Sequence, residues 1–193
     1  MKLRWMKKLS CDQLKPAQWR RWHVLEHELN TIKSRGVRTP SILELGVRDG
    51  KVPMHLCRRV EGVRYVGIDA WTDYASELAR GNHDMAYARE RMQTNRDEAM
   101  GCQRMWPAQV TMIEGLTQSV VGNINSLFDI VWIDADHSYD SVSRDIDLYH
   151  NKVKPGGIVC GHDYDWPEVH KAVHERYDSV ESCADDVWLV RTK

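Results

Sequence analysis

The chain has 193 residues, which is enough for one domain with a full hydrophobic core, or for such a domain with a small extension. Apolar residues make up 42% of it and charged residues 28%, as is typical of a globular protein. The net charge of −1 excludes a strong overall attraction to nucleic acid or to a membrane surface, so we expect neither as a partner.

The N-terminal residues 1–38 predict a helical extension. Pro16 is followed by apolar residues at helical spacing from Trp19 to Ile32, and Gly36 is placed to end the helix. One apolar face must cover a surface, which belongs either to the same domain or to a partner chain. A homo-oligomer therefore remains open.

Five short apolar runs follow, rich in Val and Ile, and each ends on a polar residue or glycine. These expected strands are 41–46, 65–69, 110–115, 130–134 and 158–163. Helical patterns separate them at 54–60, about 84–105 and 139–153. Strands that are apolar on both faces and alternate with helices predict a parallel sheet covered on both sides.

The last segment differs, because 179–183 and 187–191 flank an Ala-Asp-Asp turn and predict an antiparallel hairpin. The expected fold is therefore α/β, a Rossmann-like, doubly wound, mostly parallel seven-stranded sheet with a C-terminal antiparallel hairpin. We find no linker or repeat, and expect one domain over 1–193. Within it, 71–107 would form a helical insert near the substrate.

The cysteines bear on where the protein works. They are widely spaced and include no Cys-x-x-Cys pair (Cys11, Cys57, Cys102, Cys160 and Cys183). This argues against a disulfide framework and against structural zinc. No apolar stretch is long enough for a signal peptide or a transmembrane helix. We therefore expect a cytoplasmic protein.

Ionisable side chains gather where the expected strands end. They are Glu44, Asp69, Glu114, Asp134, Asp136, His162 and Asp163. In an open α/β sheet the ligand lies outside the carboxyl ends of the strands. This edge is therefore the expected binding site.

The turn after the first strand indicates which ligand binds. It contains Gly46 but has Glu44 and Asp49 where a dinucleotide fingerprint has glycine. A carboxylate would repel a pyrophosphate but attract a ligand with an amino group. Asp69, 23 residues beyond Gly46, can accept both hydroxyls of a ribose. The pattern favours S-adenosylmethionine over NAD, although an NAD-type oxidoreductase remains an alternative.

Several segments resemble the successive motifs of class I S-adenosylmethionine-dependent methyltransferases: ILELGVRDGK, YVGIDAW, VTMIEG and DIVWIDADHSYDSVSRDIDLYHNKVKPGGIVCGHDY. The last block most resembles methyltransferase family 24, which is akin to the metal-dependent O-methyltransferases of catechols, caffeoyl-CoA and macrolide sugars. The resemblance covers roughly residues 40–193. It implies O-methylation of a small hydroxylated acceptor such as a sugar, a glycan precursor or a secondary metabolite. A catalytically inactive cofactor-binding partner subunit is a further alternative.

The resemblance also implies roles for single residues. Glu44 and Gly46 would lie at the methionine and backbone side of the cofactor. Asp69, with Ala70 beside it, would hold the ribose. The remaining expected cofactor contacts are Glu114 and Gly115 at the adenine, and Asp134 and Asp136 near the methionine amine.

The resemblance implies a fold in which the fourth and fifth strands are neighbours, which would bring Asp134 close to His162 and Asp163. Two carboxylates that close repel unless a proton or cation lies between them. A divalent cation (Mg, Mn or another metal) could bind there together with the acceptor. The metal-dependent relatives normally have an acid at the position of His162. This histidine favours Mn²⁺, Fe²⁺ or Zn²⁺, or else no metal binds and the residues only hold the loop.

Two histidines are candidates for the catalytic base. His137 follows the acids of the fourth strand and precedes a helix, whose N-terminus is expected to keep its imidazole neutral. His162 is the alternate base if it is not a metal ligand.

Overall fold

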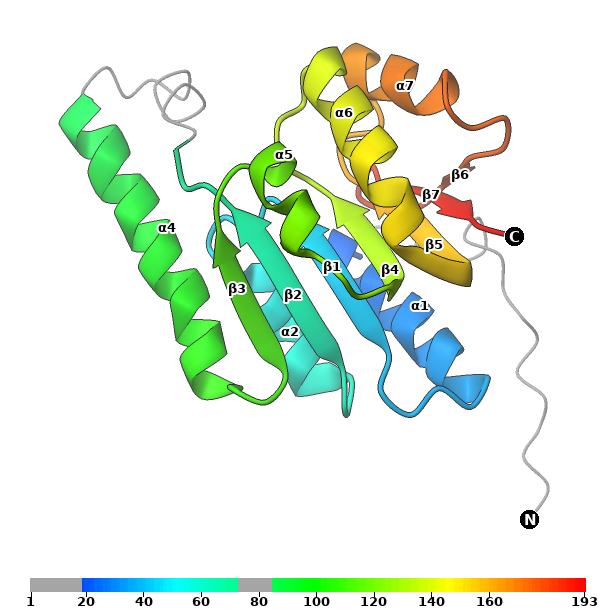
Figure 1. Cartoon of the computed structure of the whole chain (residues 1–193), viewed down its shortest axis with the longest axis horizontal. Coiled ribbons are helices and arrows are strands. Elements are labelled where there is room, and N and C mark those ends of the chain that lie inside the picture. Colours follow the sequence, from blue (N-terminus) through cyan, green and yellow to red (C-terminus); the bar gives the residue numbers. More distant parts are fainter. Residues whose placement is uncertain (1–18, 73–84) are drawn as a thin grey trace.

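The computed structural model describes residues 19–72 and 85–193. Its centre is a seven-stranded sheet in the order β3-β2-β1-β4-β5-β7-β6 (Figure 1). The strands are β1 Ser41–Leu45, β2 Arg64–Asp69, β3 Val110–Glu114, β4 Phe128–Ile133, β5 Val153–Gly161, β6 Glu181–Ser182 and β7 Trp188–Arg191. Strands β1 to β5 pair in parallel, and β7 pairs antiparallel with both β5 and β6. The predicted fold class is confirmed.

Helices cover both faces of the sheet. They are α1 Arg21–Ser34, α2 Lys51–Arg59, α4 Met85–Met105, α5 Thr117–Val120, α6 Tyr139–Tyr149 and α7 Pro167–His174, with short 3₁₀ turns at Val121–Asn123 and His150–Lys152. Apolar side chains of α1, α2 and α4 pack on one face. Those of α6 and α7 pack on the other, where Figure 1 shows α5 and α6 in front of the sheet.

Several elements differ from the predicted pattern: the short helix α5 was not predicted, and β5 begins at Val153 instead of at residue 158. Helix α6 ends at Tyr149 rather than near residue 153, because Val153 pairs with Phe128 and already belongs to β5. Helix α7 was not predicted, because its eight residues form only about two turns, too few for a clear apolar period.

The apolar face of helix α1 packs against the sheet of its own chain. Val24, Leu25 and Leu29 are buried in the core of the same chain. Glu28, only 3% exposed, accepts two hydrogen bonds of 3.0 Å from the guanidinium of Arg191 on β7. The helix therefore covers its own sheet.

The thiols of Cys57, Cys102 and Cys160 are free, and burial raises the pKa of each, to about 12 for Cys57. Cys183 is disulfide-bonded, although the cysteine spacing had argued against a disulfide framework. Cys11 and residues 73–84 of the expected insert lie outside the described residues. Within the described ranges, no helix has the length and apolar character needed to cross a membrane.

Candidate functional site

The register of the sheet brings the carboxyl ends of five parallel strands to one edge. Leu45 pairs with both Ile68 and Ile133, and Ile133 pairs with Gly161. The residues at these strand ends, or directly after them, therefore lie along this edge in the order Glu114, Asp69, Gly46, Asp134 and His162. At about 4.8 Å between neighbouring strands, the row is on the order of 19 Å long.

Gly46 allows the ends of β1 and β4 to approach closely. Its φ of 87° lies in the left-handed region. A Cβ at this position would come within 2.2 Å of the carbonyl oxygen of Asp134. Any side chain here would therefore push apart the two strand ends between which the site is built.

Asp69 at the end of β2 is held in a fixed orientation. Its carboxylate accepts hydrogen bonds from the backbone N–H groups of Arg48, at 2.8 Å, and Trp71, at 2.7 Å. The Trp71 indole N–H in turn donates to the carbonyl of Arg48, and the ring is buried in the core. Ala70 lies between these residues and is half-buried. The buried Trp71 thus holds the backbone of Arg48 and, through it, the orientation of Asp69.

Glu114 and Gly115 continue the row at β3. The exposed carboxylate of Glu114 accepts hydrogen bonds of 2.9 and 2.7 Å from Arg96 of α4. The backbone N–H of Gly115 donates to the carbonyl of Asp69, which joins the two strand ends. Helix α4 therefore reaches the site edge at the expected adenine position.

Glu44 lies inside the sheet instead of at its open edge. The residue is 1% exposed, and its carboxyl accepts a hydrogen bond from the hydroxyl of Tyr65 on β2. Burial raises the pKa of Glu44 well above the ordinary value, although the Tyr65 hydrogen bond opposes this. Its assignment to the methionine side of the cofactor stays a prediction.

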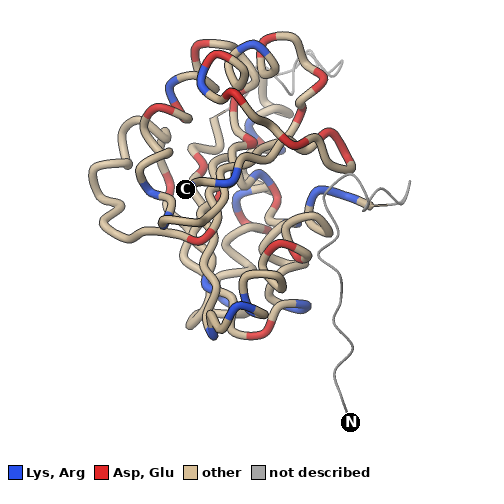
Figure 2. Tube along the Cα trace, turned by 90° about the vertical axis from the view of Figure 1, so that its right-hand side faces the viewer, with Lys and Arg blue, Asp and Glu red and all other residues tan. Residues whose placement is uncertain are grey.

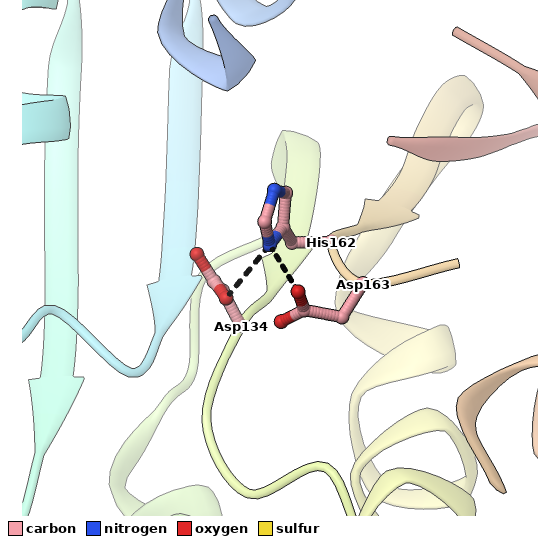
Figure 3. A group of neighbouring side chains, drawn as sticks. All are labelled: Asp134, His162 and Asp163. Carbon is pink, nitrogen blue, oxygen red and sulfur yellow. Dashed lines mark ion pairs between the residues drawn. The ribbon is translucent and has the colours of Figure 1, made fainter. Parts of the chain in front are cut away.

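Asp134, His162 and Asp163 form one group at the ends of β4 and β5, here called the Asp134 group (Figure 3). One ligand atom from each lies within 4.8 Å of the others. Nδ1 of His162 is 3.0 Å from Oδ1 of Asp163 and 3.8 Å from Oδ1 of Asp134. The predicted adjacency of the two strand ends is confirmed.

His137 joins this group from the loop before α6. Its Nε2 lies 2.8 Å from Oδ2 of Asp163 and 3.8 Å from Oδ1 of Asp134. These two carboxylates raise the pKa of His137 to about 10, against the opposing effect of burial. The expectation of a neutral imidazole is therefore wrong for this arrangement, because two nearby carboxylates outweigh the N-terminus of α6.

The same contacts lower the pKa of Asp163. Burial opposes the ionisation of Asp163, but the neighbouring His137 and His162 hold its pKa well below the ordinary value. The carboxylate of Asp163 is thus charged over the whole physiological pH range.

Arg21 and Asp185 also reach the group, and the sequence did not indicate either of them. Nη1 of Arg21, in the first turn of α1, is 2.7 Å from Oδ2 of Asp134. Asp185 in the hairpin turn accepts a 2.8 Å hydrogen bond from the backbone N–H of Arg21 and lies 3.8 Å from Nε2 of His162. No motif marks these residues, because they meet the site only through the packing of α1 and β7.

The side chains fit a divalent cation. Nε2 of His137 and Nδ1 of His162 are buried and have no partner with hydrogen-bond geometry among the described residues, although both face carboxylates. Nitrogen and carboxylate donors together suit Mn²⁺, Fe²⁺ or Zn²⁺. A cavity of about 10 Å³ beside Asp134, His137 and His162 is comparable with the space one water molecule needs. A larger hollow of about 300 Å³ lies near Val110, at the amino end of β3 and away from this group.

Asp136 and two tyrosines near the site have local hydrogen-bond partners. Asp136 accepts a 2.7 Å hydrogen bond from the N–H of Ser138, which fixes the loop before α6. The hydroxyl of Tyr139 donates to Glu175, and that of Tyr164 lies 2.7 Å from Nε2 of His174. Both tyrosines therefore contact α7, and a role of Asp136 toward the cofactor stays a prediction.

Several solved structures with a similar fold are O-methyltransferases. NovP shares 16% identity over 90% of this chain and 79% of its own, with a TM-score of 0.62. An O-methyltransferase from Bacillus cereus, solved in complex with SAH (S-adenosylhomocysteine), shares 17% identity over 92% of this chain and 84% of its own, with a TM-score of 0.54. CalS11, a TDP-rhamnose 3′-O-methyltransferase, shares 15% identity over 88% of this chain and 79% of its own, with a TM-score of 0.53. At these identities the likeness shows the fold alone.

No curated protein sequence matches the chain. The model of a methyltransferase domain family, methyltransferase family 24, matches residues 43–164, which is more than half of the chain and includes Gly46, Asp69, the Asp134 group and His137. The chain therefore belongs to methyltransferase family 24 and has the fold of the class I S-adenosylmethionine-dependent methyltransferases.

Proposed function

We propose that this chain transfers a methyl group from S-adenosylmethionine to a hydroxyl of a small acceptor, with a divalent cation held by the Asp134 group. The observation that carries the proposal is the convergence of Asp134, His162 and Asp163 with His137 at one end of a methyltransferase sheet. The acceptor class is a sugar, a glycan precursor or a secondary metabolite. The acceptor named for CalS11 contains a sugar, rhamnose, which supports the sugar part of this class.

Asp69, Gly46 and Gly115 would hold the cofactor, which supplies an activated methyl group on a sulfonium. Asp69 has a carboxylate oriented by two backbone N–H groups, as a bidentate acceptor for ribose hydroxyls requires. Gly46 leaves the backbone open at the centre of the row, between Asp69 and Asp134. The acceptor would then lie at the β4 and β5 end, where the Asp134 group is found.

Asp134, His162 and Asp163 would hold the cation, which supplies positive charge that lowers the pKa of an acceptor hydroxyl. Arg21 fixes Asp134 through Oδ2, so Oδ1 stays directed toward His162. His137 can accept a proton at Nε2 only when Asp134 and Asp163 are engaged elsewhere, because these carboxylates otherwise hold its own proton. His162 is the alternate base if it does not bind the cation.

Calorimetric titration tests the cofactor first. S-adenosylhomocysteine should bind the purified protein, and NADH should not. Binding of NADH alone would favour the oxidoreductase alternative. Metal analysis and a screen of hydroxylated acceptors, with methyl transfer followed by mass spectrometry, then separate an active enzyme from an inactive cofactor-binding subunit.

With an acceptor from that screen, His137→Ala should lower kcat by about 10²–10⁴-fold and leave S-adenosylhomocysteine binding unchanged. His150→Ala is a matched control, because this exposed histidine contacts Tyr177 and lies outside the site. If the His137 variant keeps the parental kcat, the residue is structural and His162 becomes the candidate base.

A further inference from the structure

Trp166 presents an exposed aromatic face directly beside the candidate base. Its residue surface is 52% exposed, whereas Trp71, Trp132 and Trp188 are buried. The centroid of its ring is 5.1 Å from that of the His137 imidazole, with the planes tilted by 53°. An aromatic residue half open to solvent therefore lies against the imidazole of His137.

The backbone that carries this ring is held by hydrogen bonds to its neighbours. The N–H of Trp166 donates to the carbonyl of Asp163 at 3.0 Å, and Pro167 begins α7 immediately afterwards. The N–H of Tyr139 donates to Glu168, which ties the start of α6 to the start of α7. The backbone at Trp166 is thus ordered before a ligand arrives, which reduces the entropy lost on binding.

The charged residues near Trp166 in the sequence are mostly negative. Asp163, Asp165 and Glu168 lie within three residues of it, and Asp136 adjoins His137. Residues 129–193 hold fourteen acidic residues against seven Lys and Arg, and Figure 2 shows acidic positions predominating in the upper part of the molecule, where α6 and α7 lie. Such a rim disfavours a phosphorylated or nucleotide-linked acceptor and offers hydrogen-bond acceptors to hydroxyl groups.

We propose that Trp166 is the platform on which the methyl acceptor stacks, and that the acceptor is an uncharged saccharide ring with one hydroxyl directed toward His137. This inference rests on the proposed methyltransferase function and narrows its acceptor class. The indole offers an apolar face for the C–H groups of a sugar ring, and the carboxylates bind its hydroxyls. A catechol-like ring fits less well, because the described surroundings of the platform are polar.

Ligand-observed NMR with S-adenosylhomocysteine present tests the platform. The probes are the neutral methyl glycosides of glucose, galactose, mannose and rhamnose, with TDP-rhamnose and catechol as charged and aromatic comparisons. At least one glycoside should bind the parent protein. Trp166→Ala should weaken it by about tenfold, the loss expected for a stacking contact, and Trp166→Phe should retain most of the affinity.

Leu127→Ala is the matched control. Leu127 is 48% exposed and lies just before the amino end of β4, away from the site, so its substitution should leave glycoside binding unchanged. Three results would overturn the proposal: no glycoside binds although S-adenosylhomocysteine does, Trp166→Ala binds the glycoside as the parent does, or only TDP-rhamnose or catechol depends on Trp166. If the parent fails to bind S-adenosylhomocysteine, the proposed function is contradicted instead.

Discussion

Replacing Asp145 with asparagine should stabilise the protein above about pH 6 and change its stability little near pH 4. Asp145 lies on the buried face of α6 and is 3% exposed. Its Oδ1 accepts a 2.6 Å hydrogen bond from the hydroxyl of Thr117 in α5, and the hydroxyl of Tyr149 donates to the carbonyl of Thr117. An asparagine oxygen can accept the same hydrogen bond without carrying a charge.

The size of the effect follows from the pKa of Asp145. Burial raises this pKa from 3.8 to about 6, although the Thr117 hydrogen bond and Arg144 oppose the change. The difference corresponds to a destabilisation of at most about 3 kcal/mol when the carboxyl is fully ionised. Because the pKa is raised on folding, this cost is absent below the unfolded value near 4, grows as the pH rises, and is complete above about pH 6.

Urea denaturation at about pH 4, 6 and 7.5 measures this difference. Asp145→Asn should gain about 1–3 kcal/mol at the highest pH and almost nothing at the lowest. Asp147→Asn is the control on the same helix, because Asp147 is exposed and paired with Arg176, so its effect should stay below about 1 kcal/mol. A gain that does not vary with pH, or a loss at neutral pH, would refute the argument from buried charge.

Asp69→Ala should weaken S-adenosylhomocysteine binding by more than about 1 kcal/mol in a calorimetric titration, because an oriented charged acceptor is lost; an unchanged Kd would remove the ribose assignment. Asp163→Asn should weaken Mn²⁺ binding at least about tenfold, measured by electron paramagnetic resonance, and leave S-adenosylhomocysteine binding intact. Equal Mn²⁺ affinity would exclude this carboxylate as a ligand. Glu28→Gln should lower the free energy of unfolding by about 1–3 kcal/mol, since Arg191 loses a buried charged partner, whereas a negligible change would show that Glu181 alone satisfies it.

The hydrophobic pattern and the turn residues predicted most of the architecture, although helices α5 and α7 were missed. The run Phe128–Ile133 is buried at every position, as expected of a central strand covered on both faces. Acids and a histidine directly after this run, and after Val153–Gly161, marked the ligand edge, because parallel strands bring their carboxyl ends together. The Asp134 group was therefore predictable from sequence, as was the place of Asp69.

What the sequence by itself determined is thus the order of strands and helices, the position of the antiparallel hairpin and the polar edge of the sheet, since each depends on local period and residue type. Only the tertiary structure decided that Arg21 and Asp185 reach Asp134 and His162, and that Trp166 stands beside His137. It also decided that two carboxylates lie beside His137 and raise its pKa. Contacts between residues more than a hundred positions apart, and pKa values that depend on distances of a few ångströms, arise from packing and leave no periodic signal in the sequence.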